Sequence, residues 1–255
     1  RCRLSRMFSA ADGQHALVFE QTAPGASFNM SVAGPAISAI NGGLNLQLGF
    51  GPGGPATDQV IVKERNPEFG SVLFLKDIDL KARAAPQAEA GANVGFSVAS
   101  DAIDVAAAGP LRNVSLAQGE QTLVFRTGPL AAPFGVLNDC TAHILTTWGI
   151  DPEAHRTAQR KATLLEEMTI ARAIQRQYPL RTLREGRGGV VGLAILVDPS
   201  GKPTECKITD DSGDRNLNEV ACEGLMQARF DPALDASGKP IPSYWVTRVT
   251  YRIAA

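Results

Sequence analysis

The sequence predicts two domains of different class, a mainly β N-terminal domain and an α+β C-terminal domain. Three observations carry this prediction. Short strand-like segments separated by Gly- and Pro-rich turns fill residues 1 to about 135, and a charged, alanine-rich stretch follows. From residue 188 the order becomes strand, turn, strand, helix, loop, strand. We therefore expect a β-rich domain over residues 1–150, a helical connector over 151–177 and a second domain over 178–255.

The composition is that of a globular chain without a strongly charged partner. Of the 255 residues 44% are hydrophobic, and the formal net charge is -1. A balance this close to neutral predicts neither a nucleic-acid partner nor an anionic membrane surface. The longest apolar run, Val190–Val197, is far shorter than the ~20 residues that a membrane-spanning helix needs. No membrane span is therefore expected in this chain.

The cysteines are widely spaced and form no C-x-x-C pair, which favours two structural disulfides over a zinc or thioredoxin-type site. They are Cys2, Cys140, Cys206 and Cys222. Disulfides imply an oxidising compartment, and a start at Arg1-Cys2 is what we expect of an exported chain trimmed of its signal peptide. The alternative, four buried free thiols in a cytosolic protein, stays open on this evidence.

The N-terminal domain is expected to be an antiparallel sandwich or barrel with one terminal helix. Six segments have the length and composition of strands: His15–Glu20, Leu44–Leu48, Gln59–Lys63, Ser71–Leu75, Val94–Val98 and Gln121–Phe125. Asn138 or Asp139 can cap a helix that carries Cys140 and ends at Gly149. A bond from Cys2 to Cys140 would then join the two ends of this domain.

The connector is predicted to be helical. Asp151 can cap a helix whose first turn holds Pro152, and the helix-favouring composition of His155–Gln177 ends before Tyr178-Pro179. The apolar side of this helix is formed by Leu164, Leu165, Met168, Ala171 and Ile174.

The C-terminal domain begins with a strand at Val190–Val197, a turn at residues 198–202 and a second strand at Thr204–Thr209. Apolar residues at helical spacing follow: Leu217, Val220, Ala221, Gly224, Leu225 and Ala228. The last strand, Ser243–Ile253, has one apolar face and one mixed face. Cys206 lies on the second strand and Cys222 on the helix, so that a bond between them would close the intervening turn.

Two motifs resemble catalytic or cofactor loops, and both are better explained as turns. Residues 49–54 fit G-x-G-x-x-G, but a strand follows them where a dinucleotide site needs a helix. Asp211-Ser212-Gly213 fits the loop of an aspartic protease, which requires a second such loop and an apolar approach strand. Lys207 and Asp210 make that approach polar, so a turn before a helix is the favoured interpretation.

No other group of residues in the sequence predicts a catalytic or metal site. The three histidines His15, His143 and His155 are scattered, and no pair has the spacing of metal ligands. Ser, Cys and His do not form a recognisable nucleophile arrangement. We therefore expect no catalytic residues, no metal and no cofactor, and hence a protein that is not an enzyme.

The last third of the chain contains a series of short motifs. Their order and spacing are much more specific to one family than any single motif is. The series runs Gln177-Tyr178-Pro179, Gly189–Gly201, Ser212-Gly213, Leu217-Asn218, Ala221, Ala228–Phe230, Pro232-Ala233 and Gly238–Pro240. It resembles the C-terminal domain of the periplasmic energy transducer TonB. The chain departs from that family in having a globular N-terminal domain in place of a Pro-rich spacer and membrane anchor, and in its additional Cys206 and Cys222.

The resemblance implies a three-stranded antiparallel sheet with helices on one face. In this family the sheet edge receives an extended "box" segment of outer-membrane transporters as an added strand, which is β-strand addition in physical terms. Carried over by position, the peptide-binding edge comprises Gln177, Tyr178, Pro179, Tyr244, Trp245, Val246, Thr247, Arg248, Val249 and Tyr251.

The first functional hypothesis is therefore a periplasmic interaction protein of a Gram-negative bacterium, which binds an envelope protein or transporter and serves energy-dependent transport. The alternative is a periplasmic ligand-binding or structural envelope protein. In that case the N-terminal β domain carries the function, and the TonB-like domain is a scaffold or dimer contact. A homodimer through the edge strand stays open, because free strand edges can also pair with each other.

Overall fold

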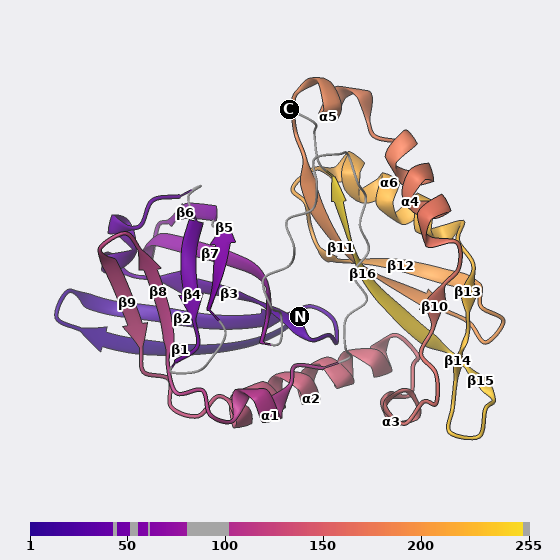
Figure 1. Ribbon diagram of the computed structural model, residues 1–255, viewed down its shortest axis with the longest axis horizontal. Coiled ribbons are helices and arrows are strands. Elements are labelled where there is room, and N and C mark those ends of the chain that lie inside the picture. The colour runs from indigo at the N-terminus through magenta and orange to yellow at the C-terminus, as the bar shows by residue number, and fades with distance from the viewer. Residues whose placement is uncertain (43–44, 52–55, 61, 81–101, 252–255) are drawn as a thin grey trace. The chain divides into compact units, whose positions relative to one another are not determined.

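The computed structural model describes residues 1–42, 45–51, 56–60, 62–80 and 102–251, which form two compact units (Figure 1). The described residues up to Thr141 belong to the first unit, and those from Ala142 onward belong to the second. This division falls inside helix α2 (Ala131–Thr147). Within the described ranges, no helix combines the length and the apolar character needed to cross a bilayer.

The first unit contains two antiparallel sheets. The larger has the order β1 (Cys2–Ala10), β2 (Gly13–Gln21), β3 (Ser27–Ala33), β7 (Gly70–Asp79) and β6 (Val62–Asn66). The smaller has the order β5 (Ala56–Val60), β4 (Asn45–Gly49), β8 (Val114–Gln118) and β9 (Gln121–Phe125). A 3-10 helix, η1 (Pro35–Ala39), and a short helix, α1 (Val105–Ala108), lie in the connections.

Aromatic rings join the two sheets and α2 into one core. Phe28 of β3 contacts Phe50, which follows β4, with a ring-centroid distance of 6.1 Å. Phe134 of α2 lies 4.9 Å from Phe28 and 5.1 Å from Phe19 of β2. Phe28, Phe50 and Phe134 are among the most completely buried side chains of the protein, so α2 helps to close the core of the first unit.

Most of the predicted strands of this unit are present, but one is wrong. The segments at 15–20, 71–75 and 121–125 lie in β2, β7 and β9. Gln59–Lys63 is divided between β5 and β6, which belong to different sheets. Of the remaining two, 45–48 lies in β4, while residue 44 and Val94–Val98 lie outside the described residues.

Three strands were not predicted. In this unit, β1 carries polar residues among its apolar ones, for instance Arg6 between Leu4 and Phe8. β3 and β8 are short strands that do alternate apolar and polar residues. Their strand conformation is stabilised by pairing with neighbours. All nine residues of β1 are in register with β2. Pairing between strands cannot be predicted from the local pattern of apolar residues.

Helix α2 begins earlier than predicted. Its first residue is Ala131, so Asn138 and Asp139 lie within the helix and do not cap it. The Asn138 side chain instead donates to the main-chain carbonyl of Ile103 and accepts from its N–H, at 2.9 and 3.0 Å. Burial of Phe134 and of its neighbours favours the additional turns, and Gly149 (φ 72°) follows the helix end as expected.

The second unit is built on a three-stranded antiparallel sheet. β11 (Gly189–Val197) lies in the centre, between β12 (Pro203–Asp210) and β16 (Ser243–Tyr251). Helices α4 (Glu167–Arg176) and α6 (Arg215–Met226) pack on one face (Figure 1). The stripe predicted for α6 is confirmed, because Leu217, Ala221 and Leu225 are buried in the core with Ile174 of α4.

The prediction of helices on one face holds for α4 and α6, and the opposite face of this sheet is partly covered as well. The end of α2 and the residues after it supply Leu145, Ile150 and Trp148, which pack against Leu196 of β11 and Tyr244 of β16. The mixed face of the last strand is therefore buried at one end. Burial of apolar side chains from a distant segment of the chain stabilises this packing.

The connector predicted as one helix over His155–Gln177 is interrupted. Asp151 caps α3 (Pro152–Arg156) as expected, with Oδ1 accepting from the N–H of Glu153 at 2.9 Å. The chain then pairs as a two-residue strand, β10 (Thr163–Leu164), with β13 (Phe230–Asp231), and α4 starts only at Glu167.

Pairing of Leu164 with Phe230 buries both side chains, and this tertiary gain overrides the helix propensity of the segment. The predicted apolar side of the connector is correspondingly divided. Ala171 and Ile174 are buried, whereas Leu165 and Met168 are exposed.

Two hairpin turns of this unit share the sequence Asp-x-Ser-Gly-Lys and the same hydrogen bonds. One is the predicted turn at Asp198–Lys202, and the other, at Asp235–Lys239, joins β14 (Ala233–Leu234) to β15 (Pro240–Ile241). In each, the Asp Oδ1 accepts from the Ser N–H and Oγ and from the Lys N–H. The glycine has φ of 82° or 83°, which only glycine adopts without strain.

Candidate functional site

The edge of the second unit's sheet at β16 is the candidate site. β16 pairs antiparallel with β11 over nine residues, from Ser243 opposite Val197 to Tyr251 opposite Gly189. In the part of the chain that the structure describes, no strand pairs with the other side of β16. An edge strand directs main-chain N–H and C=O groups outward and can accept a further strand.

Burial alternates along β16 from Trp245 onward. The buried set consists of Trp245, Thr247, Val249 and Tyr251, and the edge set of Val246, Arg248 and Thr250. Members of the buried set are at most 3% exposed, whereas the edge set is half-buried. Side-chain face and main-chain direction alternate together in an antiparallel strand. The Thr204 hydroxyl of β12 donates to the carbonyl of Leu196, which therefore points away from β16. Because Tyr244 lies opposite Leu196, that pair directs its main chain away from the β11–β16 ladder, and two-residue alternation gives the edge set the same outward direction and turns the buried set toward β11.

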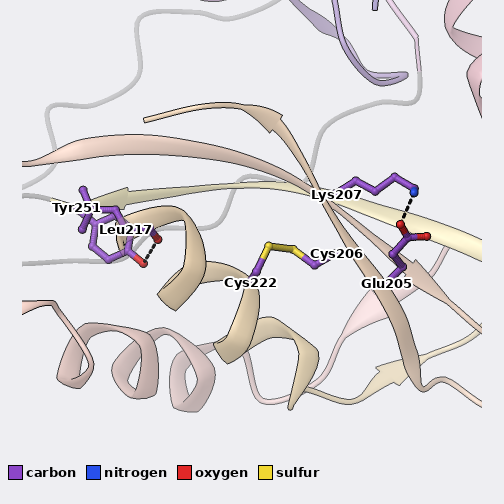
Figure 2. The surroundings of a disulfide bond; sticks show 6 residues. All are labelled: Glu205, Cys206, Lys207, Leu217, Cys222 and Tyr251. Carbon is purple, nitrogen blue, oxygen red and sulfur yellow. Dashed lines mark hydrogen bonds and ion pairs between the residues drawn. A yellow bond between two sulfur atoms is a disulfide. The ribbon is translucent and has the colours of Figure 1, made fainter. Parts of the chain in front are cut away.

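The side chains of the buried set face the helices. The Trp245 indole lies 5.5 Å from the ring of Phe230, and the Tyr251 hydroxyl donates to the carbonyl of Leu217 in α6 at 3.2 Å (Figure 2). Burial, aided by the neighbouring Tyr178, raises the pKa of Tyr251. These residues hold the strand in the sheet, so their side chains are structural in the free protein.

The other face of β16 is covered at the end that begins with Tyr244. At the covered end, the Tyr244 ring stacks on the His155 imidazole at 4.4 Å and meets Trp148 edge-on at 6.0 Å. Toward the other end lie Arg248 and Thr250, which belong to the edge set. Burial lowers the pKa of Arg248 to about 10, so that the guanidinium keeps its charge at neutral pH.

Gln177, Tyr178 and Pro179 lie next to the C-terminal end of β16. Gln177 ends α4, and Pro179 precedes α5 (Leu180–Arg184). The Tyr178 ring packs edge-on against Tyr251 at 5.2 Å, and its hydroxyl donates to the Arg187 carbonyl at 2.7 Å. Burial and the Asp214 carboxylate raise the pKa of Tyr178. The three predicted residues therefore lie near one end of the edge, beside Tyr251.

A buried carboxylate fixes this corner of the unit. Asp214 caps α6 by accepting from the Asn216 N–H at 2.9 Å, and it also accepts from the Thr182 hydroxyl at 3.0 Å. Arg187 forms an ion pair with it at 2.7 Å. Although burial opposes ionisation, these hydrogen bonds and the ion pair lower the pKa of Asp214.

Replacing this charge should make the second unit less stable in a pH-dependent way. A lowered pKa means that ionised Asp214 stabilises the fold above about pH 4, its unfolded value, and that this contribution is lost as the pH falls through the folded pKa. Asp214→Asn should therefore cost about 1–2 kcal/mol at pH 7, and the difference from wild type should shrink below pH ~4. Urea unfolding followed by tryptophan fluorescence measures it.

The exposed Asp231 offers a control for the loss of a carboxylate. Asp231→Asn should leave stability nearly unchanged at both pH values. A penalty for Asp214→Asn that is equally large at pH 7 and pH 3 would contradict the role of the charge.

Both cysteine pairs are disulfide-bonded as the sequence predicts. Cys2 and Cys140 lie in the first unit. In the second unit the bond between Cys206 and Cys222 ties β12 to α6 (Figure 2). The bond is on the strand opposite β16, so it supports the sheet without occupying the candidate edge.

The protease-like motif forms a turn, as predicted. Asp211 Oδ1 accepts from the Gly213 N–H at 2.8 Å and from the Asn218 side chain at 2.7 Å. Among the described residues, no cluster of three or more His, Cys, Asp or Glu side chains could hold a metal ion. The expectation that the protein has no catalytic residues remains a prediction.

Sequence reasoning missed three contributors. Thr250 is absent from the edge residues carried over by position, although it shares the face of Val246 and Arg248. His155 and Trp148 support Tyr244 from outside the C-terminal segment. No local pattern could have found these two residues, because their contact depends on how the chain folds back onto the sheet.

Residues 174–253 match the family described as Gram-negative bacterial TonB protein C-terminal. The resemblance predicted from the sequence is confirmed for this segment, which runs from the end of α4 through β16. The family is one of protein-interaction domains. The search among curated proteins returned no match for the chain.

Proposed function

We propose that the protein is a periplasmic interaction protein that binds an extended segment of an outer-membrane transporter, or of another envelope protein, as an added strand on β16. The observation that carries the proposal is an edge strand with outward-facing main chain inside the segment that matches the TonB family. The two disulfides support an oxidising compartment such as the periplasm. A role in energy-dependent transport belongs to the same proposal.

The geometry suggests how such a segment is recognised. Its main chain bonds to the N–H and C=O groups of the edge set, Val246, Arg248 and Thr250. Its side chains alternate between the two faces of the extended sheet. Tyr178 and Pro179 lie beside the C-terminal end of β16, where they would contact one end of the added strand. The side chains of the buried set take no direct part, so sequence selectivity rests on the edge set and on the residues near Tyr178.

Proline substitution tests this mode of binding. Val246→Pro removes an outward N–H, which an edge strand tolerates, and blocks a hydrogen bond to the added strand. Peptides carrying transporter box segments should bind the full chain with micromolar affinity in isothermal titration. Val246→Pro should weaken that binding at least tenfold.

A matched control is available on the other edge. Ile208 of β12 is 48% exposed, and Ile208→Pro should leave the peptide affinity within about twofold of wild type. Circular dichroism should show both variants folded. Absence of saturable binding up to about 1 mM peptide, or equal binding by Val246→Pro, would rule out strand addition at this edge. A dimer of the wild type that Val246→Pro dissociates would assign the edge to self-association instead.

A further inference from the structure

The first unit contains a groove that takes no part in the proposed function. It lies between the β1–β2 pair and the first turns of α2, and its volume is about 470 Å³. Small-molecule sites in proteins occupy roughly 300–1,000 Å³. The groove is lined by Leu4, Ser5, Arg6, Phe8, Leu17, Phe19, Thr127, Leu130, Ala132, Pro133 and Val136.

The strand register explains why this surface is apolar. Leu4 lies opposite Phe19 and Arg6 opposite Leu17 in the β1–β2 ladder, so that these side chains share one face of the sheet. Across the groove, Val136 of α2 is 56% exposed to solvent although it is aliphatic. The unit thus leaves a small apolar surface accessible beside a strand edge.

One charged group lies in this apolar surface. Arg6 is the only charged side chain among the described residues that line the groove. Its Nη1 donates to the Thr127 carbonyl at 2.8 Å, and its guanidinium carbon lies 5.0 Å from the centre of the Phe8 ring. These contacts hold the guanidinium in place and use one of its five N–H donors. A fixed cation at an apolar groove favours an anionic group attached to an apolar body.

We propose that the groove binds an amphipathic small molecule with an unbranched apolar chain and a single anionic head group, of which a medium-chain fatty acid is the simplest example. The chain lies along Leu4, Phe8, Leu17 and Val136, and the carboxylate lies against Arg6. A purely apolar ligand would gain nothing from the guanidinium, and a polyanion would find one cation only. Size and charge thus point to the same ligand class.

Isothermal titration of the full chain with decanoate tests the proposal, and decan-1-ol serves as the neutral analogue. Decanoate should bind at one site per chain with a dissociation constant below about 0.1 mM. Val136→Glu places a like charge at the rim and should weaken decanoate binding at least tenfold. Val124→Glu makes the same change at a valine of β9 that is 53% exposed and does not line the groove, and it should change the affinity less than twofold.

A second pair of variants isolates the head group. Arg6→Gln should weaken decanoate about tenfold and leave decan-1-ol unchanged, because only the anion uses the guanidinium. Arg3→Gln, on the opposite face of β1 and paired with Glu20, should leave both unchanged. All four positions are exposed, so the variants should fold, and far-UV circular dichroism checks this.

Three results would overturn the proposal. They are no saturable binding of decanoate up to about 1 mM, equal losses for Val136→Glu and Val124→Glu, and an equal effect of Arg6→Gln on decanoate and decan-1-ol. Peptide binding by β16 is measured on the other unit, so failure of either idea is visible separately.

Discussion

Replacing both Cys2 and Cys140 by alanine is expected to lower the free energy of unfolding of the first unit by about 4–5 kcal/mol. The bond closes a loop with a sequence separation of 138, and crosslinking so long a loop removes much of the conformational entropy of the unfolded chain. Cys2 is 2% exposed and Cys140 is on α2, so the bond also fixes the start of β1 against the helix.

Chemical unfolding measured by far-UV circular dichroism gives this loss. Tryptophan fluorescence does not suffice, since Trp148 and Trp245, the two tryptophans of the chain, belong to the second unit. Cys206→Ala combined with Cys222→Ala is the matched variant. Cys206 and Cys222 are separated by 16 residues in sequence, so the expected loss in the free energy of unfolding is smaller, about 3 kcal/mol. This loss should appear in the transition followed by tryptophan fluorescence. A loss for the first pair below that for the second would contradict the loop-length argument.

Both tests presuppose that the two disulfides form in the protein as it is isolated. The mass of the alkylated chain, with and without reductant, establishes this directly. Four alkylated thiols without reductant would contradict both the disulfides and the compartment inferred from them.

Replacing Gly201 by alanine is expected to destabilise the second unit by about 3–4 kcal/mol. Gly201 has φ 82°, where a Cβ is strained, and a Cβ built there would lie 2.0 Å from the main-chain oxygen of Phe230. That oxygen cannot move freely, because the Phe230 N–H donates to the Gly201 carbonyl at 3.0 Å. The turn and the start of β13 would have to separate, and Phe230 belongs to the core below.

The second Asp-x-Ser-Gly-Lys turn provides a close control. Gly238 has φ 83°, but a Cβ there would meet only the Gln159 side chain, at an ordinary 3.6 Å. Gly238→Ala should therefore cost only the backbone strain, about 1–2 kcal/mol. Urea unfolding followed by fluorescence of the two tryptophans compares the variants. Equal losses would mean that the contact with Phe230 adds nothing.

The elements that could be predicted are those with strong local patterns. β11 is a continuous apolar run, α6 has an apolar stripe at helical spacing, and β16 alternates. The turn at Asp198–Lys202 could also be predicted locally, because all its hydrogen bonds are made within five consecutive residues.

The elements that were mispredicted depend on partners far along the chain. β1 was missed because its pairing with β2 is what makes it a strand, and the connector helix was interrupted because Leu164 pairs with Phe230. For the candidate site, β16 and Tyr178 were found from the family pattern. The roles within it were not, since the sequence named ten residues without separating those that hold the strand from those that face outward.

By itself, the sequence predicted the main strands and the long helix of the C-terminal segment, the two disulfides and the family to which residues 174–253 are matched. Tertiary structure alone decided that Leu145 and His155 cover one end of the sheet, that Val246, Arg248 and Thr250 form the outward edge, and that Arg6 lies in an apolar groove. The physical reason is the range of the interactions. Turns and amphipathic periods are set by neighbours in sequence, whereas burial and pairing depend on residues brought together only by folding.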